Sequence, residues 1–319
     1  MKNILFLENS SGNSYGYYQE IINGISIANE NDFNILIFSN FLSETKQILT
    51  YDIQKIIEDL KNNQKCIIDA VIFGFGWTNS GHNAPNDFIL EETIDKYIIL
   101  NKEYAALDKK LDWIKKNNFK AAFTVHHDFK KYQEITGIPF YHLPFAGNPE
   151  LFKNYNPSLE YEFDFGFTGI VRTDQTENWR SKVHSTLRNK DLWQDRKIYF
   201  SDHHHDSLLD YAKRICTSKI WFSTTGPADL VGTRYYEVMM TGTTLLACNR
   251  FDYLGLFRED EHCIMFSTIE ELAEKVIFYS DVNNEEKRMR IVKAAQKFAL
   301  ENHTWVNRGK LFKEVISNE

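Results

Sequence analysis

The sequence has few cysteines and no basic clusters, and each absence excludes a class of protein. Only four of its 319 residues are cysteine and they form no CxxC pair, with positions Cys66, Cys216, Cys248 and Cys263. Their apolar or helical contexts predict buried thiols in a reducing compartment. No run of lysine or arginine is longer than two residues and the net charge is −7, which argues against nucleic acid or an anionic membrane as the main partner.

Long apolar runs are also missing. The N-terminal stretch MKNILFLENSSG has four consecutive apolar residues before Glu8, too few for the core of a signal peptide. No uncharged apolar segment approaches the length that spans a bilayer. We therefore expect a cytoplasmic protein without a transmembrane segment, and peripheral contact with a membrane surface stays open.

Three common nucleotide and nucleophile motifs are absent. There is no G-x-x-x-x-G-K-[ST], no G-x-G-x-x-G after the first strand and no G-x-S-x-G. These absences disfavour a P-loop NTPase, an ordinary dinucleotide dehydrogenase and a hydrolase with a nucleophile elbow.

What the sequence does contain is a regular alternation of short apolar runs and helical patterns. This alternation predicts parallel sheets covered on both faces, an α/β fold with two doubly wound Rossmann-like domains facing a cleft. The polar segment AGNPELFKNYNPSLEYE interrupts the pattern, so we place the domains at residues 1–152 and 153–319, with the last helix able to pack back on the first domain. Ligands of such sheets bind outside the carboxyl ends of the strands.

Helix-start patterns occur twice near the C-terminus. Ser267 with Glu270, and Asn283 with Glu286, have the spacing of a capping box, so each pair is expected to begin a helix.

The stretch GTRYYEVMMTG, residues 232–242, predicts an anion site. A helix beginning near Thr233 would present unpaired N–H groups and the positive end of its dipole. Arg234 in the first turn is unfavourable for the helix itself and is explained if a bound anion offsets it, while Glu237 one turn later could accept hydrogen bonds from sugar hydroxyls. The alternative is an ion pair between Arg234 and Glu237 on a solvated helix face.

The neighbouring residues favour the anion site over the ion pair. Tyr235, Met239 and Met240 have the character of core residues, which predicts a packed helix. Glycines in and after the loop would supply the backbone freedom of a phosphate loop; they are Gly226, Gly232 and Gly242. We therefore take Thr225, Gly226, Gly232, Thr233, Arg234 and Glu237 as nucleotide-binding candidates.

The second half of the chain resembles nucleotide-sugar glycosyltransferases of the GT-B fold, especially the spore-maturation-type branch of the group 1-like enzymes. The resemblance rests on FTG at 167–169, YAKRICTSKIWFSTT before the loop, HTWVNRGKLF near the end, and a Glu-x7-Glu pattern that here reads Asp229 and Glu237. FTVHHD and GIPFYHLPFAGNPELF extend it, so that it covers most of residues 120–312.

The resemblance implies roles for individual residues. Glu237 would bind the ribose and Arg234 the diphosphate, and Asp229 would lie near the transferred sugar, although aspartate is shorter than the family's glutamate. Gly169 would allow close approach to phosphate, and one of Arg172 and Arg180 would compensate the leaving diphosphate. Asp202 and His203 would lie in the loop that binds the base.

Two histidine-rich stretches are further candidates. His126, His127 and Asp128 end a strand, where His127 or Asp128 could act as a base or contact a sugar hydroxyl; the alternative is that Asp128 caps the next helix. DHHHD at 202–206 has no second histidine cluster at zinc spacing, so we expect a solvated loop and no metal.

Small polar and aromatic residues follow the first strand and the strand AVIFGFG. Such residues suit sugar recognition as well as ordinary turns, and they give the acceptor-site candidates Ser11, Gly12, Tyr15 and His82.

Together these features predict a metal-independent glycosyltransferase, with no cofactor beyond its donor. It would move a hexose or deoxyhexose from a nucleotide-diphosphate sugar to a hydroxyl of a glycan, glycolipid or protein. The Glu-x7-Glu resemblance suggests retention; inversion with His127 or Asp128 as base is the alternative. A nucleotide-sugar 2-epimerase of the same fold and a non-catalytic two-lobed sugar-binding protein are the other hypotheses.

Overall fold

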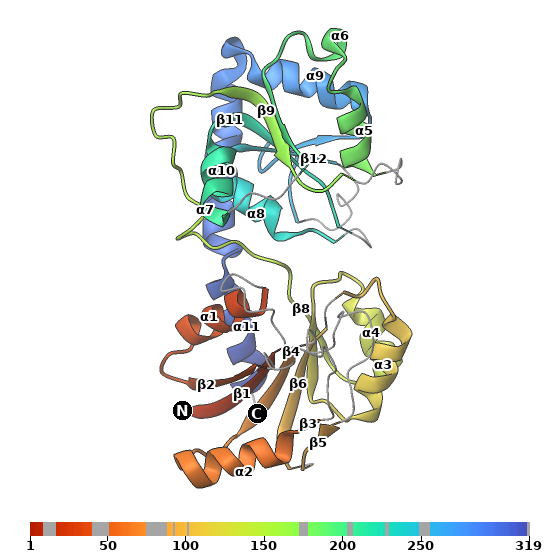
Figure 1. Ribbon diagram of the computed structural model, residues 1–319, viewed down its shortest axis with the longest axis vertical. Helices are drawn as coiled ribbons and strands as arrows, with labels where there is room; N and C mark the ends of the chain where they lie inside the picture. Colours follow the sequence, from red (N-terminus) through yellow and green to blue (C-terminus); the bar gives the residue numbers. More distant parts are fainter. Residues whose placement is uncertain are drawn as a thin grey trace. The chain divides into compact units, whose positions relative to one another are not determined.

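The computed structural model describes residues 1–8, 17–39, 51–74, 88–91, 93–100, 102–171, 178–202, 207–226, 230–248 and 256–317. The chain forms two compact units (Figure 1), unit 1 with Met1–Pro144 and Trp305–Glu319 and unit 2 with Phe145–Thr304. This division falls earlier than the one placed from the sequence between residues 152 and 153, and it assigns the last helix to unit 1.

Unit 1 is built on a six-stranded parallel sheet with strand order β2-β1-β4-β6-β7-β8. Its strands are β1 (Lys2–Glu8), β2 (Phe33–Ser39), β4 (Ala70–Gly74), β6 (Asp95–Leu100), β7 (Ala121–Thr124) and β8 (Phe140–His142). A separate pair joins β3 (Tyr51–Asp52) to β5 (Phe88–Ile89). The helices are α1 (Tyr17–Ala28), α2 (Ile53–Gln64), α3 (Leu107–Lys116), α4 (Phe129–Thr136) and α11 (Trp305–Ser317).

Alternate side chains of these strands reach opposite faces of the sheet, and both faces are apolar. Leu5, Leu7 and Phe73 belong to a buried cluster with residues of α2, α3 and α4. On the other face, the Phe123 ring of β7 stacks on Phe312 of α11 with ring centroids 4.2 Å apart. Figure 1 shows α1 and α11 together on one side of the sheet and α3 and α4 on the other. The continuous apolar runs of the sequence therefore correspond to strands of a sheet that is covered by helices on both faces.

Helices α1 and α11 cross at two glycines. A Cβ atom on Gly309 would lie 2.1 Å from the carbonyl oxygen of Gly24, and one on Gly24 would lie 2.2 Å from that of Trp305. Asn29 Nδ2 donates to the Gly309 oxygen at 3.0 Å across the same contact. The close approach of two backbones thus fixes the last helix on unit 1.

Unit 2 contains a five-stranded parallel sheet with strand order β10-β9-β11-β12-β13. Its strands are β9 (Phe163–Thr168), β10 (Ile198–Ser201), β11 (Ser218–Ser223), β12 (Thr244–Cys248) and β13 (Ile264–Phe266). Its helices are α5 (Trp179–Thr186), α6 (Lys190–Trp193), α7 (Leu208–Cys216), α8 (Thr233–Met240), the 3₁₀ helix η4 (Val282–Asn284), α9 (Ile269–Ser280) and α10 (Glu285–Asn302). The order of the strands reverses between β9 and β11, which makes this the topological switch point of the unit.

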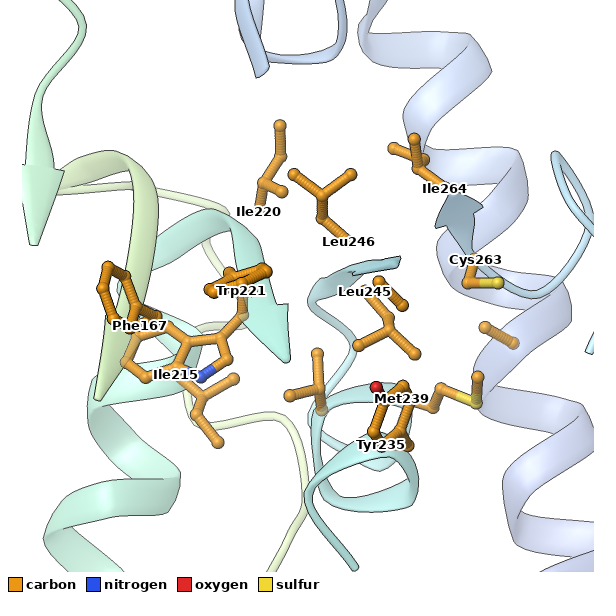
Figure 2. Close-up of a cluster of buried hydrophobic side chains, with 14 of the residues drawn as sticks. Phe167, Ile215, Ile220, Trp221, Tyr235, Met239, Leu245, Leu246, Cys263 and Ile264 are labelled. Atoms are coloured by element: carbon orange, nitrogen blue, oxygen red, sulfur yellow. The ribbon is translucent and has the colours of Figure 1, made fainter. Parts of the chain in front are cut away.

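The core of unit 2 surrounds β11 and β12 (Figure 2). Trp221, Tyr235 and Met239 are fully buried there, as the sequence predicted for the two residues of α8. All four cysteines are free, and each is buried except Cys66, which is half-buried. Helix α8 is therefore a packed element of the core of unit 2.

The predicted capping boxes are wrong in detail. Helix α9 is capped one residue later than expected, because Thr268 is extended and its hydroxyl accepts from Glu271 N at 3.1 Å. The Glu271 carboxylate in turn accepts from Ser267 N at 2.7 Å, and Glu270 takes no part in the cap. Asn283 does not cap α10; it lies in η4, where Asp281 accepts from Asn283 N.

Candidate functional site

Three predicted nucleotide-binding residues of unit 2, Gly169, Arg180 and Arg234, lie together at its topological switch point. β9 ends at Thr168 and β11 at Ser223, and these strands are neighbours in the sheet. Helix α8 begins at Thr233 after the loop that follows β11. Carboxyl ends of the two strands that flank such a point are where ligands of open α/β sheets bind.

Gly169 follows β9 with a backbone that favours glycine. Its φ of +144° lies in a region that side-chain-bearing residues rarely adopt, and its N–H donates to Ser201 O of β10 at 3.0 Å. A Cβ atom at this position would lie 3.1 Å from Nη1 of Arg180 and 3.1 Å from Nη1 of Arg234. Two guanidinium groups therefore converge on one backbone position.

Arg234, in the first turn of α8, is held by contacts outside its own helix. Its Nη1 donates to Thr168 O at 3.0 Å, and its Cζ lies 5.7 Å from the centre of the Tyr211 ring. Glu237 acts on it electrostatically from one turn further along α8, and the half-buried guanidinium does not lie on the solvated helix face of the sequence-based alternative. Burial by itself lowers the pKa of Arg234, but Tyr211 and Glu237 outweigh it and the pKa is raised. The guanidinium is a fixed, half-buried cation.

Arg180 brings the second positive charge. It lies in the first turn of α5, and its Nε donates to Thr224 Oγ1 at 3.1 Å. Burial, followed by repulsion from Arg234, lowers the pKa of Arg180 to about 10. Arginine stays protonated at neutral pH even so, and the lowered pKa records first the cost of burying this cation and then the cost of holding it beside Arg234. A bound anion would remove that cost, which is the pattern expected of a binding site.

The N-terminus of α8 adds the positive end of the helix dipole to the two positive charges of Arg180 and Arg234. Gly232 is its N-cap, and among the residues that the structure describes no side chain caps the first N–H groups. The sequence-based argument that Gly226 and Gly232 are needed for backbone freedom is wrong, because Gly232 has a φ of −81° and neither residue has a positive φ. Gly242 does need it, with a φ of +76°. At the predicted anion site, Gly169 therefore has the backbone that favours glycine, and the loop glycines Gly226 and Gly232 do not.

The structure describes some of the remaining predicted site residues of unit 2 and not others. Glu237 is half-buried one turn into α8; Thr225 follows β11 at an intermediate exposure, and Asp202 is exposed after β10. Arg172, His203 and Asp229 lie outside the described residues, as do Ser11, Gly12, Tyr15 and His82 of unit 1.

Sequence reasoning missed the groups that orient the two arginines. The Tyr211 ring, the Thr168 carbonyl and the Thr224 hydroxyl were assigned no role. Thr224 had a usable signal, because it is the first polar residue after the carboxyl end of β11. Tyr211 and Thr168 come from other elements, and only the strand order brings them to Arg234.

In unit 1, His126, His127 and Asp128 form a compact turn after β7. His127 Nε2 lies 3.4 Å from Asp128 Oδ1, and both side chains are partly exposed. His126 is buried, and its Nδ1 accepts from Asp128 N at 3.2 Å and pairs with the Tyr132 hydroxyl at 3.0 Å. Asp128 is the N-cap residue of α4, as the capping alternative predicted, but its side chain makes no cap hydrogen bond.

This turn holds the one group of possible metal ligands found in the described ranges. The Nδ1 lone pair of His126 is already engaged by an N–H group, so a neutral His126 carries its proton on Nε2. Without His126, two adjacent residues of this group remain as possible ligands among the described residues. The geometry suits an imidazole and a carboxylate that exchange protons or bind a hydroxyl group.

One family matches the sequence. The model of the glycosyl transferase-like family matches residues 169–314, starting at the glycine on which the two arginines converge. No curated protein matches the sequence significantly. No helix in the described ranges is long and apolar enough to cross a membrane.

Solved structures match the whole chain at low sequence identity. HepE from Anabaena in complex with UDP and glucose matches with a TM-score of 0.63 at 11% identity, and the match covers 100% of both chains. Sucrose-phosphate synthase from Thermosynechococcus elongatus matches with 0.62 at 10% identity over 100% of both chains. A glycosyltransferase from Rickettsia africae matches with 0.63 at 12% identity over 100% of this chain and 99% of its own. The predicted pair of Rossmann-like domains of the GT-B type is confirmed.

Proposed function

We propose that this GT-B protein, with its glycosyl transferase-like domain at residues 169–314, transfers a sugar from a nucleoside-diphosphate sugar to a hydroxyl group of an acceptor. One observation carries the proposal: two half-buried guanidinium groups, from Arg180 and Arg234, converge on Gly169 at the switch point of unit 2. A diphosphate is the ligand whose charge and size suit two arginines and a helix N-terminus.

The same groups would promote the reaction. When the bond between the sugar and the diphosphate breaks, negative charge grows on the departing diphosphate. Cations and N–H dipoles that are already in place stabilise that charge without reorganisation. Arg234 is fixed by Thr168 O and Arg180 by Thr224 Oγ1, so both meet this requirement, and the donor would need no metal ion to neutralise it.

Glu237 is the proposed ligand of the ribose hydroxyls. It lies on the helix that begins with the phosphate site, one turn further along the chain. Among the structural neighbours, crystal structures of HepE contain UDP or UDP-glucose, which supports a nucleotide donor here. The base, the sugar and the stereochemistry remain proposals: Asp229 would serve a retaining reaction, and His127 or Asp128 an inverting one.

The acceptor would be recognised by unit 1. Ser11, Gly12 and Tyr15 follow β1 in the sequence, and His82 follows β4. β1 and β4 are neighbours at the point where the strand order of this sheet reverses, so their loops are the expected ligand-binding loops of the unit. This supports a carbohydrate or glycolipid acceptor whose hydroxyl groups meet small polar side chains.

Calorimetry with UDP, GDP, dTDP and inorganic pyrophosphate tests the donor site. We expect at least one nucleoside diphosphate to bind. Glu237→Gln should weaken that binding roughly tenfold, because hydrogen bonds from ribose hydroxyls to a carboxylate are stronger than those to an amide. Pyrophosphate, which has no ribose, should bind the variant at least as tightly as the parent protein, since a negative charge has been removed.

Equal losses for both ligands, or a large fall in the unfolding midpoint of Glu237→Gln, would give Glu237 a structural role instead. Product analysis then separates the enzyme classes: transfer requires an acceptor, whereas conversion of the donor in the absence of any acceptor would indicate a 2-epimerase.

A further inference from the structure

A buried carboxylate lies beside the histidine turn of unit 1 and has no part in the proposed chemistry. Glu103 follows β6, is 3% exposed, and its Oε1 accepts a hydrogen bond from the hydroxyl of Thr124 at the end of the neighbouring strand β7. Among the described residues, the other carboxylate oxygen, Oε2, is buried without a hydrogen-bond partner. Glu103 therefore ties together the carboxyl ends of two adjacent strands.

The hydrogen bonds continue from Thr124 into the turn. Thr124 Oγ1 accepts from His126 N at 3.2 Å while it donates to Glu103. His126 Nδ1 accepts in turn from Asp128 N at 3.2 Å. Thr124, His126 and Asp128 are thus linked by hydrogen bonds that begin at one carboxylate, and these bonds limit where the backbone of the turn can place the side chains of His127 and Asp128.

The segment around Glu103 is costly to form. Lys102 and Ala106 have φ angles of 53° and 52°, in the left-handed region that non-glycine residues rarely adopt. Lys110 is fully buried and its ammonium donates to Lys102 O at 2.9 Å. Burial raises the pKa of Glu103 and lowers that of Lys110 to about 8. Strain and buried charge together are typical of positions kept for function rather than for stability.

We propose that Glu103 is a positioning residue, which acts through the Thr124 hydroxyl to hold the His126–His127–Asp128 turn in the geometry that its imidazole and carboxylate need. The inference rests on the proposed function, because it assumes that His127 or Asp128 contacts a reacting or bound hydroxyl group. Glu103 itself touches no substrate in this account.

Thr124→Val and Thr124→Ser form the test pair. Valine has the shape of threonine without its hydroxyl, so it removes both hydrogen bonds of the Thr124 oxygen, whereas serine keeps them. Thr136→Val is the control: Thr136 is also buried in unit 1, and its hydroxyl bonds to Tyr132 O rather than to the turn. Glu103→Gln serves as a second variant if Thr124→Val does not fold.

The first readout is the imidazole proton–carbon NMR spectrum, which requires no substrate. We expect Thr124→Val to shift the ring signals of His126 and His127, Thr124→Ser to restore them, and Thr136→Val to leave them unchanged. The second is steady-state kinetics with the donor found by calorimetry. There kcat should fall on the order of tenfold in Thr124→Val with KM for the donor nearly unchanged, since the effect lies in orientation.

Unshifted histidine signals in folded Thr124→Val, or a kcat equal to that of the parent protein, would overturn the positioning role. Failure of the proposed function looks different, because the parent protein would then bind no nucleoside diphosphate while the NMR comparison still decides whether Glu103 and Thr124 hold the turn.

Discussion

Arg234→Met should lower the affinity for the cognate nucleoside diphosphate roughly 100-fold, with a comparable loss in kcat/KM for transfer. Methionine keeps the length and apolar packing of the side chain against Tyr211 but removes the charge that Thr168 O directs toward Gly169. Charge-assisted hydrogen bonds to phosphate in a half-buried site are worth about 2–3 kcal/mol, which corresponds to this change. Titration calorimetry with the diphosphate measures it directly.

Arg258→Met is the matched control for Arg234→Met. Arg258 belongs to the same unit, its side chain is 74% exposed, and it pairs with Glu261 on the surface. Its loss should leave the affinity within about twofold, because exposed ion pairs contribute little. If both variants bind the diphosphate as the parent protein does, the anion site is somewhere else.

Gly309→Ala should lower the free energy of unfolding of unit 1 by about 3 kcal/mol, the upper end for overpacking a tight contact. The added methyl group would lie 2.1 Å from the carbonyl oxygen and 2.5 Å from the carbonyl carbon of Gly24, and backbone atoms cannot turn aside as a side chain can. Helix α11 would have to move away from α1, which also weakens the bond from Asn29 Nδ2 to Gly309 O. Urea unfolding followed by circular dichroism checks this expectation.

Gly226→Ala is the control for this second substitution. A Cβ atom there would lie 3.6 Å from its nearest neighbour and the φ angle is not positive, so the transition should move by less than about 1 kcal/mol. An equally small effect of Gly309→Ala would mean that α11 is not held by the glycine crossing.

The architecture could be predicted from the sequence because it depends on local patterns. Apolar runs such as Ile4–Leu7 are buried on both faces, and such runs belong to parallel strands whatever their order in the sheet. The extent of the units depends on distant contacts. Residues Phe145–Tyr155 resemble a polar linker, yet Phe152 is buried in the core of unit 2 and Leu151 and Tyr155 pack against it. Helix α11 joins unit 1 through Gly24 and Gly309, which no periodicity reveals.

For the candidate site, too, the local features could be predicted from the sequence and the long-range contacts could not. A cation in the first turn of a helix is locally unfavourable, so Arg234 could be recognised without any structure. Its partners could not, because Thr168 O and Arg180 meet it only once β9 and β11 are neighbours. From the sequence, a role for Gly169 rested on the family resemblance alone. Its φ angle and the two nearby guanidinium groups are visible only in the structure. Likewise, Glu103 carries no motif, and its importance rests on burial next to Thr124.

A crystal structure of the protein with the diphosphate selected by calorimetry tests the central claim most directly. The account predicts pyrophosphate oxygens in contact with the guanidinium groups of Arg180 and Arg234 and with the first N–H groups of α8. A diphosphate bound elsewhere, with Arg234 still bonded to Thr168 O and Arg180 to Thr224 Oγ1 as they are here, would contradict it.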